Sequence, residues 1–290
     1  MADFSDLSWS SPDGLTLHAR DYPGGEDKLP VVCIHGLTRN SRDFEDLAPL
    51  IAATGRRVIA VDVRGRGRSD RDPAPANYHP GTYAMDINAL LLAEGIGRAV
   101  FVGTSMGGII TMVLAAIRPD AIAAAVLNDV GPELSPVGIA RISGYVGQAA
   151  PIETWADAAA YIRSVNGAAF PDAPDEEWDR FARRTFREDA GGRPVLDYDP
   201  AIALAFRPDP DAPPAAPPDM WPLFRALTTG RPTLLIRGGL SDLIDEPIAR
   251  KMREAAPDMA YAEVARVGHA PMLTEPPAWA AIEALLSRVP

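Results

Sequence analysis

A serine flanked by glycines is the residue of this sequence best suited to covalent chemistry. It stands in Gly103-Thr104-Ser105-Met106-Gly107-Gly108, after the apolar run 99–102 and before a helix-like apolar pattern over 109–117. Such a turn between a strand and a helix is typical of a nucleophile elbow, which exposes the serine Oγ beside the N–H groups of the helix. Glycine is required there because a Cβ two residues to either side would collide with the neighbouring backbone. The pattern favours a nucleophilic Ser105 over the alternative, a glycine-rich loop with a buried capping serine.

A serine needs a base to become a good nucleophile, and histidine is the usual one. The sequence has four histidines, His18, His35, His79 and His269. His269 lies in Val267-Gly268-His269-Ala270-Pro271, after the strand-like segment 259–264 and far C-terminal to Ser105. We therefore expect His269 to be the base, while an ordinary surface histidine would fit the same loop.

An orienting acid should lie between the serine and the histidine in chain order. The run 233–236 predicts a strand, and Arg237-Gly238-Gly239 ends it just before Ser241-Asp242. Asp242 thus follows the carboxyl end of a strand, where open α/β sheets build their sites. We expect Asp242 to orient His269, with a plain loop aspartate as the alternative.

The oxyanion of an acyl-transfer reaction needs two N–H donors. One would be the amide after the nucleophile, Met106. The other would come from His35-Gly36-Leu37, which follows the short apolar strand predicted at 31–34. We expect the Leu37 and Met106 amides to form the oxyanion hole, and His35 to brace this loop without acting as the base.

These motifs together resemble the α/β-hydrolase family, in its serine-nucleophile branch with a helical cap inserted after the sixth strand. The motifs that carry the resemblance are His35-Gly36, Asp62–Ser69, Gly103–Gly108, Ser241-Asp242 and Gly268-His269. The resemblance implies an α/β fold with an eight-stranded, mostly parallel sheet flanked by helices. It also implies a Ser105–His269–Asp242 triad, and it makes the Asp62–Ser69 loop a structural turn beside the site.

Asp129 is the alternative acid. It stands at the end of the predicted sixth strand, over 122–127, and some members of the family draw their acid from that place. We favour Asp242, because a Ser-Asp pair after a β-branched strand and two glycines is the commoner arrangement in the family.

The remaining pattern predicts one core and one insertion. Strand and helix signals alternate up to residue 132, which favours a parallel, doubly wound sheet. They begin with a hairpin over 7–22 and include a helix expected over 41–53. From 133 to 223 there are helical patches and many prolines but no buried type of strand. We expect a core formed by 1–132 and 224–290, and a helical cap or lid over 133–223.

Composition limits the partners. The 290 residues carry a formal net charge of −11, which disfavours nucleic acid because that partner needs a basic footprint. The one cysteine, Cys33, lies in an apolar run and cannot form an internal disulfide. No signal peptide or membrane span is evident, so we expect a cytoplasmic protein with no membrane partner. We expect neither a cofactor nor a metal, and a homodimer is compatible with the sequence.

The predicted function is a serine hydrolase that cleaves a small or medium carboxylic ester or lactone through an acyl-enzyme. Such a carboxylesterase or lactonase would take a small-molecule acyl substrate. One alternative is a carbon–carbon bond hydrolase of dienol-ketone acids from aromatic degradation. Thr104, Ala270 and the oxyanion loop depart from the pattern of those enzymes. The other alternative is a ligand receptor on the same fold with little turnover.

Two arginines follow the oxyanion loop. Arg39 and Arg42 could clamp a substrate carboxylate in a bidentate manner. Ion pairs with neighbouring acids such as Asp43 or Glu45, or simple solvation, are the favoured interpretation.

Overall fold

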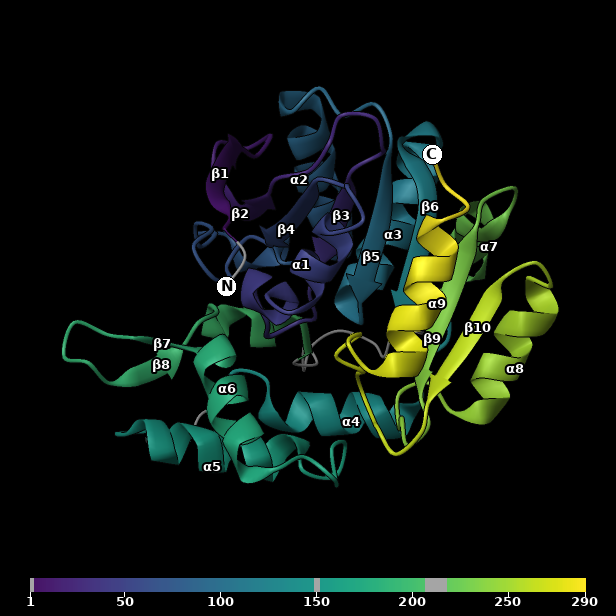
Figure 1. The fold of residues 1–290 in the computed structure, drawn as a ribbon. Coiled ribbons are helices and arrows are strands. Elements are labelled where there is room, and N and C mark those ends of the chain that lie inside the picture. The colour runs from purple at the N-terminus through teal and green to yellow at the C-terminus, as the bar shows by residue number, and fades with distance from the viewer. Residues whose placement is uncertain (1–2, 149–151, 207–217) are drawn as a thin grey trace.

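The computed structural model describes residues 3–148, 152–206 and 218–290. Its centre is an eight-stranded sheet with the strand order β1-β2-β4-β3-β5-β6-β9-β10 (Figure 1). The strands are β1 (Ser5–Ser10), β2 (Thr16–Tyr22), β3 (Val31–Ile34), β4 (Val58–Asp62), β5 (Ala99–Thr104), β6 (Ile122–Asn128), β9 (Thr233–Gly238) and β10 (Ala260–Val264). Strands β3 to β10 of this sheet run parallel, whereas β2 is antiparallel to both of its neighbours, β1 and β4. The predicted fold class is confirmed.

Helices cover both faces of the sheet, as expected when parallel strands are buried on both sides. Along β3, side chains alternate between two apolar clusters: Val32 and Ile34 face one, and Val31 and Cys33 face the other. The first cluster also takes side chains from α2 (Pro80–Ala93), α3 (Met106–Ile117), α7 (Trp221–Thr228) and α8 (Glu246–Ala255). The second takes side chains from α1 (Leu47–Ala52) and α9 (Pro276–Leu286).

The single helix expected over 41–53 is divided. A 3-10 turn, η1, spans Ser41–Phe44, and α1 then runs from Leu47 to Ala52. Pro49 explains the break because it has no N–H to donate to the carbonyl of Glu45, as an uninterrupted helix would require. Short 3-10 turns also occur at η2 (Pro75–Asn77) and η3 (Pro119–Ala121).

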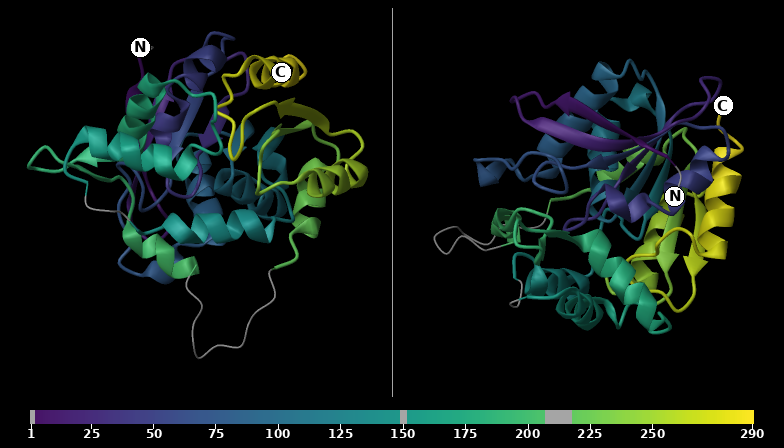
Figure 2. Two further views of the ribbon diagram at one scale, coloured as in Figure 1. Left: turned by 90° about the horizontal axis from the view of Figure 1, so that it is seen from below. Right: turned by 60° about the vertical axis from the view of Figure 1, so that its left-hand side comes forward.

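The chain between β6 and α7 forms an insertion, a name we keep for the elements α4 to η4. They are α4 (Pro136–Tyr145), α5 (Trp155–Asn166), α6 (Asp175–Thr185), the hairpin β7 (Phe186–Glu188) and β8 (Pro194–Leu196), and the 3-10 turn η4 (Pro200–Phe206). They lie over the carboxyl ends of the parallel strands, as seen from below in Figure 2. The insertion has an apolar cluster of its own, which includes Ile162, Trp178 and Phe186.

The predicted division at 132/133 and 223/224 remains a prediction. In the structure, Trp221 already belongs to α7, which packs against α3 of the core. None of the helices in the described ranges is long and apolar enough to cross a membrane.

Candidate active site

Ser105 occupies the sharp turn between β5 and α3. Its φ of 52° lies in the left-handed region, which is uncommon for a residue with a side chain. The flanking glycines make this turn possible. A Cβ on Gly103 would lie 2.5 Å from the carbonyl carbon of Gly107, and a Cβ on Gly107 would lie 2.0 Å from the carbonyl oxygen of Ile34. The expected steric need for glycine at both positions is confirmed.

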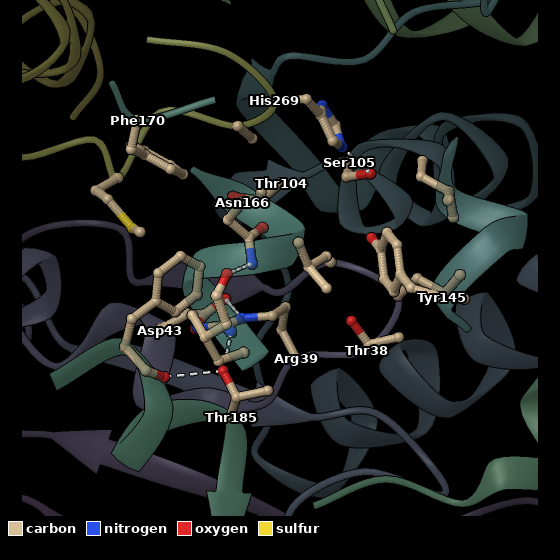
Figure 3. Close-up of a pocket in the computed structure, with 18 of the residues that line it drawn as sticks. Thr38, Arg39, Asp43, Thr104, Ser105, Tyr145, Asn166, Phe170, Thr185 and His269 are labelled. Carbon is tan, nitrogen blue, oxygen red and sulfur yellow. Dashed lines mark hydrogen bonds and ion pairs between the residues drawn. The ribbon is translucent and has the colours of Figure 1, made fainter. Parts of the chain in front are cut away.

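His269 lies on the loop after β10, directly against the serine. Its Nε2 is 2.9 Å from Ser105 Oγ, and its Nδ1 is 2.8 Å from Asp129 Oδ2 (Figure 3 shows the serine contact). A carboxylate only accepts, so the imidazole proton resides on Nδ1. Nε2 is then free to accept the hydroxyl proton of Ser105, which is the arrangement that general-base activation of a serine requires.

Asp129 follows the last residue of β6 and is completely buried. Besides His269, its carboxylate accepts hydrogen bonds from the Gly238 amide at 2.9 Å and from Ser241 Oγ at 2.5 Å. Three donors therefore surround a charge that would otherwise be costly to bury. They also fix the direction in which the carboxylate meets the imidazole.

The structure corrects the prediction that Asp242 contacts His269. Arg141 of α4 binds the Asp242 carboxylate with two hydrogen bonds, Nε to Oδ2 at 2.5 Å and Nη2 to Oδ1 at 2.8 Å. The hydrogen bonds from Arg141 hold the pKa of Asp242 below its usual value. The reason is that Arg141 holds the Asp242 carboxylate, while His269 Nδ1 already contacts Asp129, which follows the strand next to the nucleophile strand. Asp129, the alternative acid, lies next to His269.

The predicted oxyanion loop passes close to the nucleophile. A Cβ on Gly36 would lie 3.7 Å from Ser105 Cβ. The part of the chain that the structure describes offers no hydrogen-bond acceptor to the amides of Leu37 and Met106. Their role as oxyanion donors remains a prediction.

His35 braces this loop, as expected. It is fully buried, its Nδ1 is 2.7 Å from the Gly36 carbonyl, and its Nε2 accepts from the Val63 amide at 3.1 Å. Burial lowers the pKa of His35 to about 4, so the ring is neutral at physiological pH. With both nitrogens engaged, His35 is a structural residue.

Arg66 is a site residue that sequence reasoning missed. It is 1% exposed, its Nε donates to the Leu37 carbonyl at 2.9 Å, and its Nη2 lies 3.5 Å from Met106 Sδ. It therefore contacts both residues whose amides are the predicted oxyanion donors. The Asp62–Ser69 loop that carries it is structural in the expected sense, since Asp62 accepts from the Ser41 amide at 2.7 Å.

A cavity of about 110 Å³ opens beside Ser105. Both the core and the insertion contribute to it. The core supplies Gly36 to Arg39, Asp43, Phe44, Thr104, Ser105 and His269 to Leu273, and the insertion supplies Ile142, Tyr145, Tyr161, Ile162, Val165, Asn166, Phe170, Phe181, Thr185, Leu196 and Tyr198. In the described part of the chain, no three His, Cys, Asp or Glu side chains gather in a way that could hold a metal ion.

Both arginines after the oxyanion loop form ion pairs. Arg39 binds Asp43, one of the two acids named from the sequence. Arg42 binds Asp197 of the insertion at 2.5 Å, and not Glu45. The favoured interpretation is confirmed for Arg39. Arg42 also forms an ion pair, but with an acid that is distant in the sequence.

The fold and this arrangement of serine and histidine define an α/β hydrolase, and the sequence agrees. Residues 30–276 match the family described as alpha/beta hydrolase fold, so the chain belongs to that family. A crystal structure of an alpha/beta hydrolase from Novosphingobium aromaticivorans is 48% identical, matches 100% of both chains and has a TM-score of 0.92.

Two curated relatives extend over most of the chain. The 3-hydroxybutyrate-oligomer hydrolase of Cupriavidus necator is 33% identical over 273 residues, which cover 92% of this chain and 91% of that protein. The 2-(acetamidomethylene)succinate hydrolase of Mesorhizobium japonicum is 28% identical over 256 residues, with 88% and 85% covered. The chain is therefore a hydrolase of the α/β fold.

Proposed function

We propose that this protein cleaves a small or medium carboxylic ester or lactone through an acyl-enzyme on Ser105. The observation that carries the proposal is the continuous chain of hydrogen bonds from Asp129 through His269 to Ser105 Oγ. Nucleophile, base and orienting acid are the three groups that acyl transfer by a serine requires.

The geometry suggests the following course. Ser105 Oγ attacks the acyl carbon while His269 Nε2 takes the hydroxyl proton, and Asp129 stabilises the imidazolium through Nδ1. The Leu37 and Met106 amides hold the oxyanion, each lowering the barrier by about 3–4 kcal/mol. Collapse expels the alcohol, which takes the proton from Nε2. Water then attacks the acyl-enzyme with His269 again as the base, and the acid and free Ser105 are released.

One of the relatives supports a short acyl group. The Cupriavidus necator relative is named for oligomers of 3-hydroxybutyrate, a four-carbon hydroxy acid. We therefore propose short hydroxyacyl esters as the first substrates to test. In this proposal the insertion acts as the cap that shapes the pocket, and the protein works without a cofactor.

The test is hydrolysis of 4-nitrophenyl butyrate by the wild type and by Ser105→Ala. We expect Ser105→Ala to lose turnover and to keep the wild-type melting temperature. Ser287→Ala, an exposed serine near the end of α9, is the matched control and should retain full activity. Undiminished hydrolysis by Ser105→Ala would refute the acyl-enzyme, and tight ligand binding by a wild type without turnover would favour a receptor.

A further inference from the structure

The cavity beside Ser105 contains a charge pair that the proposed chemistry does not use. Arg39 Nε donates to both carboxylate oxygens of Asp43 at 2.9 Å, and Nη2 donates to the same carboxylate. Both side chains line the cavity yet are only 14% and 16% exposed. Figure 3 shows the pair on the side of the pocket away from His269.

Two residues of α6 hold the guanidinium in place. Arg39 Nη1 donates to Thr185 Oγ1, and the guanidinium carbon lies 4.2 Å from the centre of the Phe181 ring. The core loop and the insertion thus fix Arg39 together. An arginine held by a carboxylate, a hydroxyl and an aromatic face is preorganised, so ligand binding costs little side-chain conformational entropy.

The pairing with Asp43 removes the attraction of Arg39 for an anion. A substrate carboxylate would have to displace Asp43, which is tied to the arginine by three contacts and lies four residues away on the same segment. Moving a charged ligand next to an intact pair would leave one negative charge without a partner in a half-closed cavity, which is unfavourable. This end of the pocket therefore disfavours carboxylates.

The pair can still bind an uncharged oxygen. A guanidinium has five N–H groups. Asp43 engages two of them and Thr185 one, so each terminal nitrogen keeps one N–H without a partner in the described ranges. The Asp43 oxygens keep lone pairs beside these donors. A hydroxyl group suits this combination because it both accepts and donates, and an ester carbonyl can use the donors alone.

The pair lines the same cavity as the nucleophile. A Cβ on Gly36 would be 3.7 Å from Ser105 Cβ and 3.6 Å from Arg39 Cγ. Gly36 therefore stands between the serine and the stem of the arginine. An acyl chain on Ser105 that runs along this wall would approach the Arg39–Asp43 pair.

We propose that Arg39 and Asp43 form a subsite for an uncharged hydroxyl or ester oxygen of the acyl chain. The inference rests on the proposed hydrolysis of hydroxyacyl esters and adds the two residues that would select them, together with the requirement that the bound part be neutral. A hydroxy-acid oligomer would then bind with its hydroxyl end in the pocket and its carboxylate end toward solvent. Arg39 and Asp43 act as specificity-determining residues.

The experiment compares three 4-nitrophenyl esters at pH 8: butyrate, 3-hydroxybutyrate and the hemi-ester of glutarate. Ratios of kcat/KM cancel any general loss of activity in a variant. For the wild type we expect 3-hydroxybutyrate to exceed butyrate about fivefold, the gain of one to two neutral hydrogen bonds. We expect the glutarate hemi-ester to fall about tenfold or more below butyrate.

Asp43→Asn tests the charge argument, because it leaves the Arg39 cation without its counter-charge. We expect the ratio of glutarate hemi-ester to butyrate to rise about tenfold or more. Arg39→Met should instead lower the preference for 3-hydroxybutyrate without raising the ratio for the glutarate hemi-ester. The control is Asp197→Asn, which removes the counter-charge of Arg42. Arg42 is on the same loop as Arg39 but outside the cavity, so the kcat/KM ratios of 3-hydroxybutyrate and of the glutarate hemi-ester to butyrate should not change.

Two results would overturn the subsite. One is a wild type that prefers butyrate or the glutarate hemi-ester to 3-hydroxybutyrate. The other is a ratio for the glutarate hemi-ester that is the same in the wild type and in folded Asp43→Asn. If Asp43→Asn does not fold, the hydroxyl preference in Arg39→Met decides. A wild type that hydrolyses none of the three esters would instead refute the proposed function, so the two failures are distinguishable.

Discussion

Replacing Asp129 by asparagine should stop catalysis, because the structure dictates how the new amide would be oriented. Asp129 Oδ1 accepts from the Gly238 amide, and only the oxygen of an asparagine can do the same. The amide NH₂ would then take the place of Oδ2, which now faces Ser241 Oγ and His269 Nδ1. Flipping the amide would set two donors against each other at Gly238, at a cost of about 1–3 kcal/mol.

The effect on the histidine follows. An NH₂ group facing Nδ1 donates to it and moves the imidazole proton to Nε2, so Nε2 can no longer accept the proton of Ser105. A wrong tautomer of this kind lowers kcat about 10⁴-fold, or about 5.5 kcal/mol in the barrier. The sheet should remain folded, since the Gly238 hydrogen bond survives.

The assay is kcat/KM for 4-nitrophenyl butyrate, with a thermal melt of each variant. The matched control is Asp242→Asn, which removes an ion pair whose side chains are each 29% exposed. It should cost at most about 1 kcal/mol of stability and leave kcat within about threefold of the wild type. A loss of several thousandfold in Asp242→Asn, together with an active Asp129→Asn, would refute the assignment of the acid.

Two further predictions concern stability. Gly107→Ala should destabilise the fold by several kcal/mol and lower the melting temperature by many degrees, since its Cβ would overlap a main-chain oxygen 2.0 Å away. Gly97→Ala, where a Cβ meets nothing within 4 Å, should leave the melting temperature nearly unchanged. His18→Gln should lower the melting temperature mainly at low pH. Burial acts to lower the pKa of His18, but the hydrogen bonds of His18 to Asp62 and Asp6 outweigh burial and raise that pKa. A group whose pKa is raised in the folded state contributes its full stability below its unfolded pKa, about 6.5 for histidine, and loses it as the pH rises through the folded pKa. The difference in melting temperature from the wild type should therefore be full below about pH 6.5 and shrink at higher pH. Equal melting temperatures for the two alanine variants, or a His18→Gln gap that widens at alkaline pH, would contradict these arguments.

The sheet and the elbow were predictable because local patterns determine them. The runs around Val31, Val58 and Ile122 are apolar on both faces, as is typical of parallel strands buried between two helical layers. The tight turn requires glycine at Gly103 and Gly107, and their spacing of two residues on either side of Ser105 can be read directly from the sequence. The apolar periodicity over 41–53 predicts one helix, but it does not register that Pro49 lacks an N–H, and the structure divides the segment.

The choice of acid could not be made from local sequence. Asp129 and Asp242 both follow a strand that ends at the same edge of the sheet, and chain order allows either. What separates them is burial and the neighbouring strand: Asp129 is fully buried beside the elbow, and Asp242 is half-buried against α4. The signal in the sequence was the position of Asp129 directly after its strand. Arg66 and the Arg39–Asp43 pair likewise depend on contacts between distant segments.

The pairing of β5 with β6 sets which parts of the site survive partial unfolding. The two strands stay in register from Val100 and Ala124 up to Thr104 and Asn128, so Ser105 and Asp129 leave the sheet at the same level. Their amides still donate into it, to Asn128 at 2.9 Å and to Ile236 at 2.7 Å. Such hydrogen bonds exchange only when the whole sheet opens, whereas an insertion with its own small core can open at lower free energy. In mild denaturant, the enzyme should therefore lose discrimination among esters before it loses the ability to cleave them.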